Sequence, residues 1–75
     1  MSWNLTGQAA VANYLGNRVQ GIITESRVKY GGAVEHSITL IAGFDDGIVS
    51  REAGGEVLVE GDQILEVGKI YLGGA

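Results

Sequence analysis

Residues 22–41 read IITESRVKYGGAVEHSITLI, and this stretch carries the clearest structural signal in the chain. In its second half, four residues that face one way alternate with polar residues that face the other way; the four are Val34, His36, Ile38 and Leu40. A period of two is typical of a half-buried β-strand. The stretch therefore predicts a β-hairpin that turns at the Gly31-Gly32 pair, with the chain's one histidine on the apolar face of the second strand.

The facing of the two strands selects the connecting loop, because a shift of one residue turns every side chain to the opposite face. A two-residue loop at Gly31-Gly32 would place the apolar row of one strand beside charged residues of the other. A three-residue loop, Tyr30-Gly31-Gly32, keeps the apolar rows together and gives Gly32 the left-handed position that such loops need. It pairs Val28 with Val34, Arg27 with Glu35, Ser26 with His36, Thr24 with Ile38, and Ile22 with Leu40. A loop at Gly31-Gly32-Ala33 keeps the same faces and pairs Lys29 with Glu35 instead.

Length and composition indicate a small folded domain whose own core gives it little stability. The 75 residues form one predicted domain, 1–75, and a chain of this size buries roughly 60% of the surface that its unfolded form exposes. At 45% hydrophobic residues, the chain is too apolar for a disordered segment, and it has no cysteine for disulfides. These features favour a homo-oligomer, because association adds buried apolar surface.

The charge balance argues against a general nucleic-acid binder. The net charge is −4, whereas binding to phosphates requires a concentrated basic surface. No apolar run approaches the roughly 20 residues of a membrane span, and the first residues do not resemble a signal peptide. We therefore expect a cytoplasmic protein that contacts no membrane and for which nucleic acid is an unlikely partner.

The expected architecture is mainly β: a small antiparallel five- or six-stranded barrel or roll with one short N-terminal helix. The helix is expected at residues 5–15, because Leu5, Ala9, Ala12 and Leu15 have helical spacing, Thr6 can cap the start and Gly16 can end it. The β region is expected to cover residues 18–72. A short helix is marginal alone, so it should dock on the sheet or on a second subunit.

The strands of the β region are separated by glycine-rich turns. They are expected at residues 18–30, with a bulge at Gly21, and then at 34–41, 48–52, 56–60, 63–67 and 69–72. The Asp46-Gly47 pair indicates a type I′ turn.

Five residues of the predicted hairpin are candidates for binding: His36, Ser26, Arg27, Lys29 and Tyr30. His36 is the natural acid or base, because an unperturbed imidazole titrates near neutral pH. Nucleophilic catalysis, however, needs a nucleophile, a base and an orienting group. Ser37 faces away from His36, which leaves Ser26 across the strands. We therefore favour a structural histidine bonded to Ser26 or to backbone, and assign no catalytic residue.

No metal or cofactor site is predicted. The acidic residues that follow Asp45 lack the ligand order and the sixth-position glycine of a calcium loop, and a solvated acidic surface explains them. The glycine pairs do not match the phosphate-binding motifs of nucleotide-binding proteins. They are expected to be turns.

Residues 55–67, GEVLVEGDQILEV, resemble the V-x-x-G-D-x-I-L-E-V pattern of lipoyl and biotinyl carrier domains. They also resemble the G-D-x-[IV]-x-V hairpin of swapped-hairpin transcription factors. The resemblance implies two strands joined by a β-turn. The modified lysine of the carrier domains has no counterpart, because Lys69 follows Gly68 in a different context, so no functional residue is carried over.

The sequence favours a small non-enzymatic binding or assembly module, such as an accessory protein of a phage, a mobile element or a bacterial operon. A protein partner fits this function. One alternative is an enzyme whose active site forms at an oligomer interface, with His36, Ser26 and Tyr30 meeting residues of other copies. Another is a small barrel that binds nucleic acid weakly through Arg27 and Lys29.

Overall fold

The computed structural model describes residues 3–68, which form a five-stranded antiparallel sheet and a separate two-stranded hairpin. The sheet contains β1 (Ala9–Tyr14), β2 (Asn17–Val28), β3 (Val34–Leu40), β6 (Glu56–Glu60) and β7 (Ile64–Val67), in the spatial order β6-β3-β2-β1-β7. The hairpin contains β4 (Phe44–Asp45) and β5 (Ser50–Arg51), and the short 3-10 helix η1 (Gly61–Gln63) joins β6 to β7. The prediction of a mainly β, antiparallel fold is confirmed.

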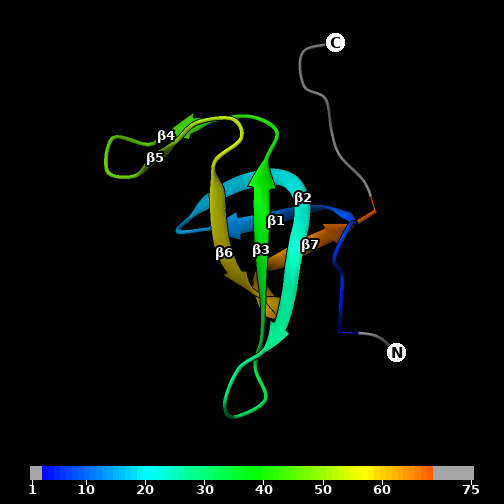
Figure 1. Cartoon of the computed structure of the whole chain (residues 1–75). Helices are drawn as coiled ribbons and strands as arrows, with labels where there is room; N and C mark the ends of the chain where they lie inside the picture. Colours follow the sequence, from blue (N-terminus) through cyan, green and yellow to red (C-terminus); the bar gives the residue numbers. More distant parts are fainter. Residues whose placement is uncertain (1–2, 69–75) are drawn as a thin grey trace.

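Strand β2 connects the two halves of the sheet. It pairs with β1 along its first half and with β3 along its second half, and it curves strongly between them (Figure 1). Both partners flank Gly21, where an added Cβ would overlap the carbonyl oxygen of Thr39 and lie 2.8 Å from Cγ2 of Ile38. The predicted bulge at Gly21 is therefore wrong: this glycine allows a close approach of two backbones.

The bulge in β2 lies at Thr24, and it divides the predicted hairpin register into a correct and an incorrect part. On the loop side, Val28 pairs with Val34, Arg27 with Glu35 and Ser26 with His36, as the Tyr30-Gly31-Gly32 loop predicts. Beyond the bulge, Ile23 pairs with Ile38 and Gly21 with Leu40, so the predicted pairs Thr24–Ile38 and Ile22–Leu40 are wrong. One extra residue reverses the facing of everything before it, which leaves Ile22 37% exposed and Ile23 fully buried.

The predicted N-terminal helix at residues 5–15 is wrong, because this segment contains β1. Ala10, Val11 and Ala12 are all completely buried, and a strand buried on both faces has a continuous apolar sequence that helical spacing can mimic. Gly16, expected to end a helix, lies instead in the two-residue turn between β1 and β2, with a φ of 84°. A glycine with positive φ can end a helix or occupy a hairpin turn, so Gly16 did not distinguish the two.

Among residues 3–68 the sheet does not close into the predicted barrel, because β6 and β7 are its two edges. The turn predicted between them is present as η1, and both strands have nearly the expected bounds. They pair with β3 and β1 instead of with each other, so the hairpin geometry implied by the resemblance is wrong. The predicted strand at residues 69–72 lies outside the described residues.

The buried core lies on the concave side of the curved sheet. Its buried members are Ala10, Ala12, Val19, Ile23, Ile38, Leu40, Val57 and Val59, with Leu5, Tyr14, Phe44 and Ile64 packed against them. The β4–β5 hairpin projects beyond this core (Figure 1). Its turn is not type I′, because Gly47 has a φ of 90° but Asp46 does not share the positive φ. No helix among residues 3–68 is long and apolar enough to cross a membrane.

Candidate functional site

His36 and Ser26 form a hydrogen-bonded pair inside the hairpin. Ser26 Oγ lies 2.7 Å from Nδ1 of His36, and it also accepts a hydrogen bond of 3.0 Å from the backbone N–H of Leu5. The serine hydroxyl can therefore donate to the imidazole while it holds the N-terminal segment against β2. The structure brings together the two residues that the sequence placed opposite each other.

His36 is enclosed, with 2% of its surface exposed. Burial lowers the pKa of His36 below its usual value, because a buried imidazolium loses its hydration. The neutral ring is therefore favoured, and a substrate cannot reach it without displacing the surrounding residues. This arrangement fits the structural reading of His36.

Arg27 and Lys29 belong to a network of ion pairs on the outer face of the sheet. Arg27 donates to Glu35 at 2.6 and 2.9 Å, and Lys29 donates to Glu60 at 2.8 Å. Glu35 and Glu60 are cross-strand neighbours, so the two cations separate two carboxylates that would otherwise repel. The hydrogen bond that Arg27 donates to Glu35 raises the pKa of Arg27, and the one that Lys29 donates to Glu60 raises the pKa of Lys29.

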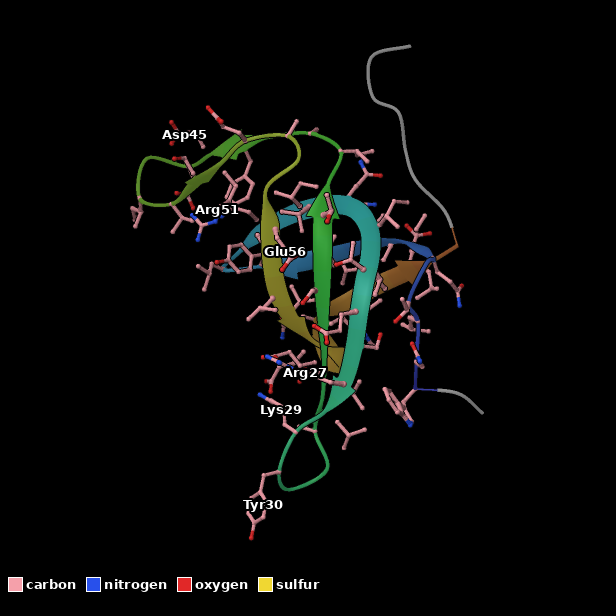
Figure 2. All side chains as sticks on the ribbon, in the orientation of Figure 1. Arg27, Lys29, Tyr30, Asp45, Arg51 and Glu56 are labelled. Carbon is pink, nitrogen blue, oxygen red and sulfur yellow. The ribbon has the colours of Figure 1, made fainter. Side chains whose placement is uncertain are left out.

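This network gives no support to nucleic-acid binding, because the two candidate cations are neutralised by carboxylates of the same face. Figure 2 shows Arg27 and Lys29 at the same end of the sheet, with Tyr30 farther out at the tip of the loop. Tyr30 is fully exposed. The five predicted candidates thus separate into the hydrogen-bonded pair of His36 and Ser26, a charged outer pair and an isolated tip.

A second surface, which was not predicted from the sequence, lies beside β6. Within residues 3–68, β6 pairs with β3 on one side only, and its other edge has no strand partner. Between this edge and the β1–β2 turn lies a shallow groove whose walls include Leu58 of β6 and Leu15 of the turn. Their exposed fractions are 47% and 66%, respectively. We call this surface the β6 groove.

Leu15 is held in an unfavourable backbone conformation. Its φ is 51°, and the following Gly16 also has a positive φ, as a type I′ turn requires at both central positions. A left-handed conformation costs roughly 1–2 kcal/mol for a residue with a Cβ. Asparagine or glycine would avoid much of this cost, so the turn exposes a large apolar side chain at the expense of stability. Such an outlier motivates a functional hypothesis.

The β4–β5 hairpin is attached to the end of β1 and the start of β2 by aromatic and polar contacts. Asn17 donates to Asp46 Oδ2 at 2.8 Å, and the ring of Tyr14 lies edge-on to Phe44 with centroids 6.2 Å apart. Arg51 lies over the Tyr14 ring, 5.7 Å from its centroid. These contacts fix one wall of the β6 groove, because Tyr14 also lines it.

The carboxylate of Asp46 organises the hairpin turn. Its Oδ1 accepts hydrogen bonds from the backbone N–H groups of Val49 and Ile48, at 2.7 and 2.8 Å. These bonds, together with the one from Asn17, lower the pKa of Asp46 to about 2. The stabilisation is therefore present above the ordinary pKa of an aspartate and is lost as the pH falls toward 2.

Neither a metal site in the described part of the chain nor a relative assigns a chemistry to the protein. Residues 3–68 contain no group of three or more histidine, cysteine, aspartate or glutamate side chains placed to hold a metal ion. Comparison of the chain with family models, curated proteins and solved structures gave no match.

The sequence contains a turn pattern beside the β6 groove that was overlooked because a helix was predicted at residues 5–15. Tyr14-Leu15-Gly16-Asn17 has the length of a two-residue hairpin turn, with glycine at one of its central positions. The exposure of Leu58 could follow from the alternation of residues 56–60, in which Val57 and Val59 face the core. The proximity of Leu15 and Leu58 depends on the curvature of the sheet, which no local pattern encodes.

Proposed function

We propose that this chain is a non-enzymatic assembly module that associates with further copies of itself through the β6 groove. The observation that carries the proposal is the combination, in one place, of an unpaired strand edge with two exposed leucines. An unpaired edge offers backbone donors and acceptors to an added strand, and apolar side chains beside it supply burial.

The β6 groove also accounts for the strained turn. Leu15 is two-thirds exposed in a conformation that stability alone would not select. Burial of a leucine side chain contributes about 1.5–3 kcal/mol, so a contact with another copy can offset the strain. The other candidate region, around His36, is enclosed, which makes it a part of the core.

An NMR dilution series tests this proposal. We expect the amide signals of Leu15 and Leu58 to shift as the concentration of the unmodified chain rises, because these residues become buried between copies. The signal of Ile48, in the turn between β4 and β5 and outside the groove, is the internal reference and should remain constant. Spectra that do not change with concentration, or changes centred on Ile48, would contradict the proposal.

A further inference from the structure

We infer that the strand that enters the β6 groove is residues 69–72 of a second copy, so that the copies join head to tail. These residues read Lys-Ile-Tyr-Leu and lie outside the described part of the chain. The inference rests on the proposed function and deepens it by naming the segment that fills the groove. Head-to-tail contacts build rings when the rotation between copies closes and filaments when it does not.

The charges beside the groove select a basic strand. Glu56 and Glu60 flank Leu58 on β6, and Asp62 follows in η1. One cation, Lys29, is bonded to Glu60, so carboxylates exceed cations along this edge. A strand that brings a positive side chain is therefore favoured over a neutral or acidic strand.

The charges also disfavour symmetric pairing of two β6 edges. An antiparallel pair centred on Leu58 would place Glu56 of each copy directly opposite Glu60 of the other. Like charges at opposite positions destabilise a sheet. The added strand should therefore come from another part of the second copy, which makes the interface heterologous.

The sequence of residues 69–72 has the chemistry that the groove requires. Isoleucine, tyrosine and leucine supply apolar area, and isoleucine and tyrosine are favoured in strands. Lys69 supplies a cation for the acidic edge. The strands at the two edges of the described sheet do not share this chemistry, since β7 carries Glu66 and β6 carries two glutamates.

Reach favours a second copy over the same chain. β7 begins next to Gln63, which lines the groove, and it ends where the N–H of Gly68 donates to the carbonyl oxygen of Ala9 at the far end of β1. Over this length β7 carries the chain about 13–16 Å away from the groove. Four further residues span at most about 14 Å. Within one chain, only Leu72 could return to the groove.

Mixing two full-length variants tests the inference. The groove variant, Leu58→Asp, retains an intact segment 69–72, whereas the tail variant, Ile70→Asp with Leu72→Asp, retains an intact groove. Each variant alone should sediment as a monomer of about 7.8 kDa, because each lacks one side of the interface. A 1:1 mixture should form a heterodimer of twice that mass, since one tail can enter one groove.

Three results would overturn the inference. The first is a tail variant that still assembles alone while the unmodified chain assembles; this refutes the named segment and leaves the groove proposal standing. The second is a mixture that remains monomeric under conditions where the unmodified chain assembles. The third is an unmodified chain that is monomeric, which refutes the proposed function as well. Far-UV circular dichroism verifies that each variant is folded, and Leu58→Lys replaces Leu58→Asp if the aspartate disrupts β6.

Discussion

The hairpin interior around His36 and the β6 groove differ in how far their key side chains are exposed to solvent. His36 is sealed, with its Nδ1 bonded to Ser26 and 2% of its surface exposed. Leu15 is displayed, with 66% of its surface exposed on a strained backbone. A histidine enclosed in the core is part of the packed structure. An apolar side chain that is exposed on a strained backbone indicates contact with a partner. For this reason we assign the proposed self-association to the β6 groove and not to the region around His36.

The largest expected effect comes from crowding the buried core at Gly21, where β2 lies against both β1 and β3. The substitution Gly21→Ala should lower the free energy of unfolding by about 3 kcal/mol or more, because the new Cβ overlaps the backbone of β3 and neither strand can move alone. Urea denaturation measures the loss. The control is Gly61→Ala, where the nearest atom to the added Cβ lies 3.8 Å away, an ordinary contact. Equal stabilities of the two variants would disprove the tight packing of β2 against β3.

A smaller effect on the free energy of unfolding, of opposite sign, is expected at the exposed Leu15. Leu15→Asn should raise the free energy of unfolding by about 1 kcal/mol, because Asn-Gly is favoured in type I′ turns and asparagine tolerates positive φ. The same substitution should weaken self-association, since it removes an apolar wall of the groove. Leu15→Ala is the matched control: it should weaken association without relieving the strain. A variant Leu15→Asn that is less stable than the unmodified chain would argue against the strained turn.

The smallest effect is the pH dependence of stability that the buried His36 causes. Because the pKa of His36 is lowered in the folded chain, the unfolded chain binds more protons as the pH falls below the ordinary histidine pKa of about 6.5. The folded state should therefore lose stability between that pKa and the lowered one. Urea midpoints measured above and below pH 6.5 should differ less for His36→Gln than for the unmodified chain. An equal difference in both proteins would show that His36 is not the group responsible.

Much of the sheet could be predicted because its signals are local. The alternation from Val34 to Leu40 predicts β3, and the loop at Tyr30-Gly31-Gly32 predicts the pairing of Arg27 with Glu35 and of Ser26 with His36. The prediction fails at Thr24, where one inserted residue reverses the facing without leaving a pattern in the sequence.

The N-terminal segment could not be assigned from its own residues. The alanines at positions 9, 10 and 12 suit a helix by propensity, yet they also let β1 lie buried between β2 and β7, where larger side chains would not fit as closely. Only the tertiary setting separates these two outcomes. The groove was missed for the same reason, because one of its walls, Leu15, belongs to the turn that follows β1.

Sedimentation velocity tests most directly whether the β6 groove is the assembly surface. The unmodified chain should sediment faster as its concentration rises, and Leu58→Lys should abolish this dependence. Leu65→Lys is the matched control, because Leu65 is 54% exposed but belongs to β7, outside the groove. We expect the unmodified chain and Leu65→Lys to assemble and Leu58→Lys to remain a monomer. Assembly of Leu58→Lys to the same extent as the control would contradict the assignment of assembly to the β6 groove.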